Sequence, residues 1–262
     1  MRTRLDAELV RRGLARSREH AVDLIESRSV LVRGIPASKP ASQVDAETSI
    51  TLAGARNDYV SRGGHKLAGA LDAFSGIAIE GKVALDAGAS TGGFTDVLLK
   101  RGARKVIAVD VGYGQLAWEL RQDSRVEIHD RTNVRTLTSE MLSESPEIVV
   151  ADLSFISLTL VIPALIAVTK PDADFVIMVK PQFEVGREKL GAGGVVRDPQ
   201  LRRSAVRDVA TSALEVGLGT VGVVASSLPG PSGNVEYFLW LKAGAPRISD
   251  EALDEAIAKG PQ

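Results

Sequence analysis

A glycine-rich stretch, KVALDAGASTGGFTD at Lys82–Asp96, constrains the fold of this chain more than any other segment. A short apolar run, Val83–Leu85, ends at Asp86, and glycines at 88, 92 and 93 separate it from a helical pattern that opens at Thr95. Strand, glycine turn and helix in that order form the first unit of a nucleotide-binding α/β fold, in which the backbone approaches a ligand closely. The spacing matches neither G-x-G-x-x-G nor G-x-x-x-x-G-K-[ST], so it does not indicate a phosphate cradle.

The chain after this stretch extends the unit into a sheet. A second apolar run ends at Asp110, 24 residues after Asp86, near the offset of about 20 residues at which such an acid meets ribose hydroxyls. Apolar strands that alternate with amphipathic stretches predict a parallel sheet with helices on both faces. Helices are expected at Pro199–Val216 and Asp250–Ala258, and a short connection between the last two strands predicts an antiparallel hairpin. The predicted strands are Val83–Leu85, Val106–Val109, Val126–Ile128, Ile148–Val150, Phe175–Val179, Thr220–Ala225 and Val235–Leu241.

Composition excludes several classes of protein. The chain has no cysteine, which excludes disulfides, thiolate metal sites and cysteine nucleophiles, and its three histidines are far apart, so we expect no metal site. Hydrophobic content of 44% and charged content of 25% are ordinary for a soluble globular protein. The longest apolar run, Leu158–Val168, is too short to span a membrane, carries Pro163 and predicts a buried helix. With no signal segment at the start of the sequence, we expect a cytoplasmic protein.

The first 39 residues are basic. They hold nine Lys or Arg against five acids, a net charge of +4, which leaves −5 for the remainder. An arginine-dominated end on a near-neutral protein is typical of a polyanion-binding module; the alternative is a solvated charged helix face. Apolar residues at helical spacing from Leu5 to Leu14, a second helix capped by Ser17, and strands at 30–32 and 49–52 organise this segment.

This arrangement, RLDAELVRRGLARSREHAVDLIESRSVLVRG, resembles the S4 type of RNA-binding domain, which is named after a ribosomal protein. The glycine that is usual before the first strand is replaced here by Arg28-Ser29. The resemblance implies a small α+β RNA-binding domain over residues 1–58, a linker at 53–61, and a second domain over 62–262. In that family the two helices present arginines to structured RNA. The residues expected to contact RNA are Arg4, Arg11, Arg16, Arg18 and, at the start of the second domain, Arg62.

Four ionisable residues stand at strand or helix ends, where a doubly wound sheet places its site. Lys66 lies on the helix before the first strand, Asp152 and Lys180 end the fourth and fifth strands, and Glu236 opens the last one. An isolated buried ammonium is costly, so an acid must lie near Lys180, and Asp152 on the adjacent strand is its natural partner. The alternative for this pair is a structural ion pair that caps the sheet.

These features together resemble a known family. The glycine turn resembles motif I of S-adenosylmethionine (SAM) methyltransferases, and Lys66, Asp152, Lys180 and Glu236 resemble the K-D-K-E tetrad of FtsJ-type ribose 2′-O-methyltransferases. With VSRGGHKL, VDVGYGQL, ADLSFISL, VKPQFEVG and GPSGNVEYF, the whole chain resembles the TlyA family, historically called haemolysin A. The resemblance implies a class I SAM-dependent methyltransferase with a Rossmann-like, seven-stranded, mostly parallel sheet.

The TlyA family 2′-O-methylates cytidines in ribosomal RNA (rRNA). Members that share this chain's extended N-terminal helix and C-terminal helix modify both 16S and 23S rRNA, whereas shorter members modify only 23S rRNA. The resemblance therefore implies SAM as cofactor, rRNA or ribosomal subunits as partner, and the tetrad as catalytic residues, with Lys180 as the base or hydroxyl-orienting group. The residues that it implies for the cofactor are Asp86, Gly88, Ala89, Ser90, Thr91, Gly92, Gly93, Phe94, Asp110, Val111, Asp130, Arg131, Thr132, Asn133 and Asp152. For Asp130–Asn133 the alternative is a surface turn.

Two other functions stay open from the sequence. An RNA-binding or ribosome-assembly factor would keep the fold without activity, but the complete tetrad and the intact glycine turn argue against it. A membrane-active haemolysin would need a spanning segment, a strongly amphipathic basic helix or a secretion signal, and we find none that is convincing. Aromatic content of 4% leaves few rings for stacking bases, which predicts recognition by RNA shape and arginine–phosphate contacts with one nucleotide flipped out. The oligomeric state cannot be predicted.

Overall fold

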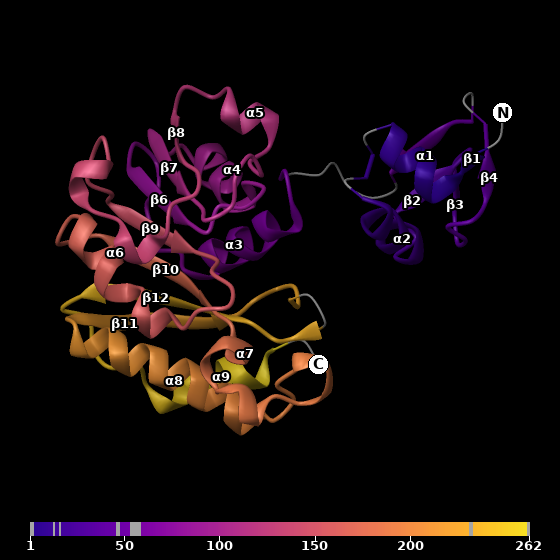
Figure 1. Ribbon diagram of the computed structural model, residues 1–262. Helices are drawn as coiled ribbons and strands as arrows, with labels where there is room; N and C mark the ends of the chain where they lie inside the picture. Colours follow the sequence, from indigo (N-terminus) through magenta and orange to yellow (C-terminus); the bar gives the residue numbers. More distant parts are fainter. Residues whose placement is uncertain are drawn as a thin grey trace. The chain divides into compact units, whose positions relative to one another are not determined.

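The computed structural model describes residues 3–12, 14–15, 17–45, 48–52, 59–230 and 233–260. The chain divides into two compact units, Met1–Asp58 and Tyr59–Gln262, each with a hydrophobic core of its own (Figure 1). Of the predicted linker, residues 53–58 lie outside the described residues. Val60 already belongs to the second unit, because its amide donates a hydrogen bond to Asp96 at 2.9 Å. Over the described ranges, none of the helices has the length and apolar character needed to cross a membrane.

The small unit packs two helices on short strands. Ser17 caps the second helix as predicted, since its hydroxyl accepts a hydrogen bond from the His20 amide at 3.1 Å. Arg28 has a φ of 57°, the left-handed conformation that glycine adopts most easily, so this arginine takes the place of the usual glycine in the turn before β2. The elements are β1 (Thr3–Arg4), α1 (Leu5–Arg11), α2 (Arg18–Glu26), β2 (Val30–Val32), β3 (Ile35–Pro36), β4 (Gln43–Val44) and β5 (Ile50–Leu52).

The second unit is built on a seven-stranded sheet in the order β11-β12-β10-β9-β6-β7-β8. Strands from β8 to β10 pair in parallel, and β12 pairs antiparallel with both β10 and β11. The predicted mostly parallel sheet with a closing hairpin is therefore confirmed, although Glu236 directly precedes the last strand rather than opening it. The strands are β6 (Val83–Ala87), β7 (Lys105–Val109), β8 (Val126–His129), β9 (Ile148–Ala151), β10 (Asp174–Val179), β11 (Leu218–Ala225) and β12 (Tyr237–Ala243).

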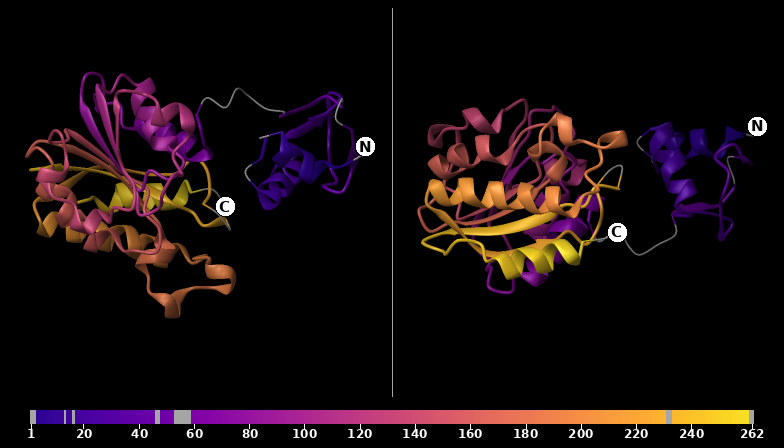
Figure 2. Two further views of the ribbon diagram at one scale, coloured as in Figure 1. Left: turned by 45° about the horizontal axis from the view of Figure 1, so that its top comes forward. Right: turned by 90° about the horizontal axis from the view of Figure 1, so that it is seen from below.

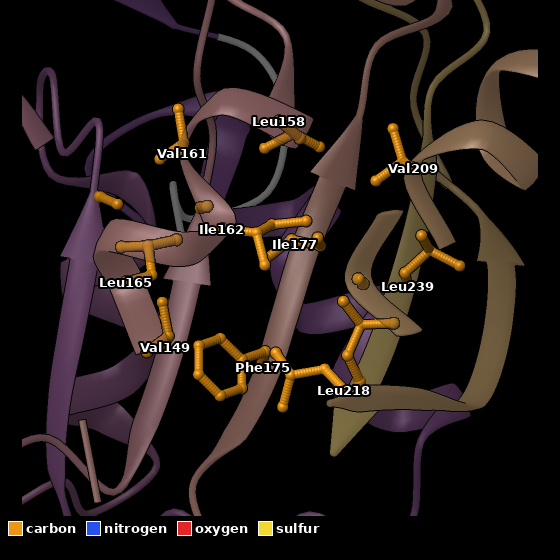
Figure 3. Close-up of a cluster of buried hydrophobic side chains, with 14 of the residues drawn as sticks. Val149, Leu158, Val161, Ile162, Leu165, Phe175, Ile177, Val209, Leu218 and Leu239 are labelled. Atoms are coloured by element: carbon orange, nitrogen blue, oxygen red, sulfur yellow. The ribbon is translucent and has the colours of Figure 1, made fainter. Parts of the chain in front are cut away.

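Helices cover both faces of this sheet, because successive strand residues point to opposite sides. Leu85 packs in the cluster that includes α6, α8 and α9, whereas its neighbour Ala84 packs in the cluster of α3, α4 and α5. Figure 3 shows Phe175 and Ile177 of β10 in the first cluster, and Figure 2 shows α8 (orange) and α9 (yellow) beside the strands. The helices are α3 (Arg62–Ala73), α4 (Gly93–Lys100), α5 (Trp118–Arg121), α6 (Ile162–Val168), α7 (Pro181–Glu184), α8 (Pro199–Glu215) and α9 (Asp250–Ala258).

Candidate active site

The carboxyl ends of two neighbouring parallel strands carry an ion pair. β9 ends at Ala151 and β10 at Val179, so Asp152 and Lys180 follow them directly. Lys180 Nζ lies 2.6 Å from Asp152 Oδ1 and donates a hydrogen bond to Ser154 Oγ at 2.8 Å. The predicted partnership of the buried lysine with Asp152 is confirmed, and Ser154 is an additional partner.

The other two tetrad residues form a second ion pair at the same edge. Lys66 of α3 lies 2.5 Å from Glu236 Oε2, and both side chains are buried. Val179 is paired with Tyr237 in the β10–β12 ladder, so Lys180 and Glu236, one residue beyond each, lie opposite one another. Removing one partner of a buried pair costs about 3–5 kcal/mol, so this pair is part of the fold as well as of the site.

A cavity of about 430 Å³ lies beside the first ion pair. The glycine turn after β6 and the segments after β7 and β9 form its walls, and Asp152 is the tetrad residue among its lining residues. One side chain, Asp152, therefore both lines the cavity and pairs with Lys180. Its lining residues are Gly88, Ser90, Val109, Asp110, Val111, Gln115, Asn133, Val134, Asp152, Leu153, Ser154, Phe155, Ile156 and Val161.

The glycine turn takes its shape from close backbone contacts. Gly88 has a φ of 87°, and a Cβ there would lie 2.5 Å from the Asp152 carbonyl oxygen, so a side chain is excluded. Asp110 fixes the other side of the turn: it accepts hydrogen bonds from the amides of Ser90 at 2.8 Å and Gly112 at 2.6 Å. α4 begins at Gly93, earlier than the predicted Thr95. The turn is thus held open as a wall of the cavity before any ligand binds.

Asp86 lies behind this wall rather than in it. The side chain is fully buried, and the Thr95 hydroxyl of α4 donates a hydrogen bond to it at 2.6 Å. Burial raises the pKa of Asp86 to about 7, and the nearby charge of Asp152 adds to the increase. The position follows from strand alternation, because Asp86 points to the same face as Ala84.

Replacing Asp86 with asparagine is expected to change how stability depends on pH. The folded pKa of about 7 exceeds the unfolded value of about 3.9, so the folded state holds the proton more tightly. Wild-type stability therefore falls as the pH rises from about 4 to about 7, by up to about 4 kcal/mol. Asparagine still accepts from Thr95 but does not ionise, so D86N should gain in melting temperature relative to wild type between pH 5 and pH 8. The exposed control Asp72→Asn should show no such gain, and parallel pH curves for D86N and wild type would contradict the assignment.

The remaining residues implied for the cofactor are divided between the cavity and its supports. Val111 and Asn133 line the cavity, but Ala89, Thr91, Gly92, Gly93 and Phe94 are not among its lining residues. Asp130 instead pairs with Arg121 at 3.1 Å and accepts from the Gly114 amide, while the Arg131 guanidinium lies 4.3 Å from the Tyr113 ring centre. Thr132 donates its hydroxyl to the Asp130 carbonyl. The 130–132 segment thus braces the loop that carries the cavity's rim.

Sequence reasoning missed one wall of the cavity, the segment Leu153–Ile156, and four further lining residues: Val109, Gln115, Val134 and Val161. Phe155 is 91% exposed and has a φ of 63°, which is unusual for a bulky residue. The one signal in the sequence was the position of the Leu153–Ile156 segment directly after Asp152, the acid that follows β9. A phenylalanine in such a segment reads as core, so its exposure could not be foreseen.

The arginines of the small unit are organised by two buried acids. Asp6 accepts from Arg4 at 2.8 Å and Arg18 at 3.1 Å, and Glu8 accepts from Arg11 at 2.6 Å. The hydrogen bonds from Arg4 and Arg11, respectively, are the main reason that the pKa of each carboxyl lies below its usual value. All three guanidiniums remain largely exposed, so donors are left for a ligand. Arg62 is exposed at the first position of α3, and Arg16 lies outside the described residues.

Comparisons with known proteins agree with this geometry. Residues 59–243 match the family model described as FtsJ-like methyltransferase, and residues 3–50 match the S4 domain. The 16S/23S rRNA (cytidine-2′-O)-methyltransferase TlyA of Mycobacterium tuberculosis is 56% identical over 99% of both chains. The chain belongs to the TlyA family of FtsJ-like methyltransferases.

Two further relatives are less similar in sequence than the M. tuberculosis protein. The 23S rRNA (cytidine-2′-O)-methyltransferase TlyA of Campylobacter jejuni is 34% identical, over 86% of this chain and 93% of that protein. A solved structure from Streptococcus thermophilus, described as a hemolysin, is 37% identical with a TM-score of 0.81, over 98% of this chain and 95% of that one. Both domains of the present chain are thus found in a single relative of known structure.

Within the part of the chain that the structure describes, no three His, Asp or Glu side chains come together as a metal site.

Proposed function

We propose that this protein transfers the methyl group of SAM to the ribose 2′-hydroxyl of a cytidine in rRNA, in both 16S and 23S rRNA. The observation that carries the proposal is the double role of Asp152, which lines the cavity and holds Lys180 at 2.6 Å. Asp152 would therefore lie next to both a cofactor in that cavity and the proton acceptor Lys180. The M. tuberculosis relative, which is named for both rRNAs, supports the choice of substrates.

The cavity residues fit SAM. Gly88 leaves room where a Cβ would collide with backbone, Asp110 presents a carboxylate at the end of β7 for ribose hydroxyls, and Leu153 and Ile156 offer apolar walls for an adenine. Bound SAM supplies an electrophilic methyl group on a sulfonium.

Lys180 has the contacts required of the base. An ammonium has three donors; Lys180 donates one to Ser154 and is ion-paired with Asp152, so donor capacity is left for the 2′-hydroxyl. In its neutral form the same nitrogen accepts the hydroxyl proton as the oxygen attacks in line. The ion pair between Lys66 and Glu236 holds the start of β12 in place beside Lys180.

Asp110→Ala is expected to weaken SAM binding by about 1–3 kcal/mol, the cost of leaving buried hydrogen-bond partners unsatisfied. The substitution removes both the acceptor for ribose and the hydrogen bonds from Ser90 and Gly112 that shape the turn. Titration calorimetry with SAM measures the change, and RNA affinity without SAM should stay unchanged. Asp123→Ala, which removes a partly exposed acid paired with Arg125, is the control. An unaltered SAM dissociation constant in D110A would make Asp110 a structural residue only.

The proposed function is tested with the purified protein, SAM and small or large ribosomal subunits that lack the modification. We expect reverse-transcription stops at low nucleotide concentration to reveal one 2′-O-methylated cytidine in each rRNA, and Lys180→Ala to leave both sites unmodified. Methyl incorporation into a base rather than a ribose would overturn the proposed chemistry. Incorporation into 23S rRNA alone would overturn the dual substrate.

A further inference from the structure

A half-buried acid outside the tetrad fastens the cavity wall to α7. Glu184, the last residue of α7, accepts a hydrogen bond from the Leu158 amide at 2.9 Å and another from the Ser157 hydroxyl at 2.5 Å. Each of its two carboxylate oxygens is used, Oε1 by the amide and Oε2 by the hydroxyl. The 152–158 loop, which runs from Asp152 to Leu158, is therefore tied at its end to the same short helix that Lys180 precedes.

The same loop holds Lys180 at its beginning. Asp152 and Ser154 are the polar contacts of the Lys180 ammonium, and the Phe183 ring of α7 lies 6.0 Å from it. The Phe155 and Phe183 ring centres are 5.0 Å apart. Phe155 has a φ of 63°, in the left-handed region that is unfavourable for a residue with a side chain. The loop thus keeps a strained conformation that contacts outside it must stabilise.

The partial burial of the Glu184 carboxyl is itself unfavourable. Burial raises the pKa of its carboxyl, and the charge of Asp208 on α8, the other acid that acts on it, raises it further. Its side chain does not belong to the cavity lining, and it makes no contact with Lys180 among the described residues. The carboxylate therefore stabilises the loop and does not touch the reacting groups.

We propose that Glu184 is a positioning residue for methyl transfer: it fixes the 152–158 loop on α7 so that Asp152 and Ser154 keep Lys180 aligned with the 2′-hydroxyl. The inference rests on the function proposed above. Glu184 differs from the tetrad residues in its role, because it acts by holding the 152–158 loop and not by contacting the reacting groups.

The test compares Glu184→Ala with Glu184→Gln at saturating SAM and ribosomal subunits. Alanine removes both acceptors, and we expect turnover to fall by about 10–100-fold, the range for a misplaced catalytic group. Glutamine can accept from the Leu158 amide and donate to the Ser157 oxygen, so E184Q should stay within about twofold of wild type. The control is Glu188→Ala, an exposed acid four residues later, which should match wild type.

Two further measurements distinguish positioning from a general loss of structure. Hydrogen exchange of the free protein should show faster exchange of the Leu158 amide in E184A but not in E184Q. In a double-mutant cycle with Ser154→Ala, the loss from E184A should be much smaller than in the wild-type background, because both substitutions release the same lysine. If E184A does not fold, Ser157→Ala removes one donor and should give a smaller loss of the same kind.

Each outcome decides the matter. Wild-type turnover in E184A with an active wild-type enzyme would overturn the inference, as would equal losses in E184A and E184Q or full additivity with S154A. An inactive wild-type enzyme would overturn the proposed function instead, and unchanged exchange at Leu158 would then overturn the role of Glu184 in holding the loop.

Discussion

Lys180→Ala is expected to lower the rate of methyl transfer by about 100-fold or more, while the protein still folds and still binds SAM and rRNA. A positioned proton acceptor contributes about 10²–10⁴-fold to a rate, and Lys180 is the group that the Asp152 and Ser154 contacts position. The fold should tolerate the change because the side chain of Asp152 is 26% exposed and water can solvate it once its partner is gone. Single-turnover transfer from labelled SAM measures the loss, and calorimetry and gel shift check binding.

Lys180→Arg separates the role of base from that of a positive charge. A guanidinium stays protonated and cannot take the hydroxyl proton, so this variant should be as slow as alanine. The control is Lys170→Ala, a half-exposed lysine paired with Glu147, which should retain wild-type turnover. Near-normal turnover in K180R would rule out Lys180 as the base.

Deletion of residues 1–58 is expected to abolish activity on rRNA and to leave SAM binding intact. The second unit begins at Tyr59 and has its own cores, so it should fold without the first. The lost unit carries Arg4, Arg11 and Arg18 on two buried acids, an arrangement that points cations outward for phosphates. Turnover on ribosomal subunits and SAM calorimetry on the truncated protein measure the two halves of this prediction.

Point variants sharpen the same prediction. If Arg18 contacts a phosphate, Arg18→Gln should reduce the slope of log affinity against log salt by about one. Arg104→Gln, an exposed arginine paired with Glu144, should leave the slope unchanged. Full activity of the truncated protein, or equal slopes for R18Q and wild type, would show that the small unit does not bind the substrate.

The sheet and the Lys180–Asp152 pair could be predicted because strong physical rules govern them. Apolar runs that end in charged residues define buried parallel strands, and a buried ammonium requires an acid on the next strand. Asp86 could not be placed, because its motif indicates the cavity while strand alternation turns its side chain to α4. The exposed position of Phe155 could not be predicted either, because a phenylalanine in the sequence looks the same whether it packs in a core or lies at the edge of a cavity. The sharing of Asp6 by Arg4 and Arg18 depends on where α1 begins, which periodicity fixes only to within a few residues.

The ion pair between Lys66 and Glu236 joins positions 170 residues apart, and the strand that Glu236 precedes lies inside the sheet, between β10 and β11. During synthesis, N-terminal parts of a chain fold first. The S4 unit and the five parallel strands therefore leave the ribosome while Lys66 has no acid to pair with. The site closes only when β12 has been translated and inserted next to β10. A growing chain that has not yet reached β12 therefore lacks the Lys66–Glu236 pair and with it a complete tetrad.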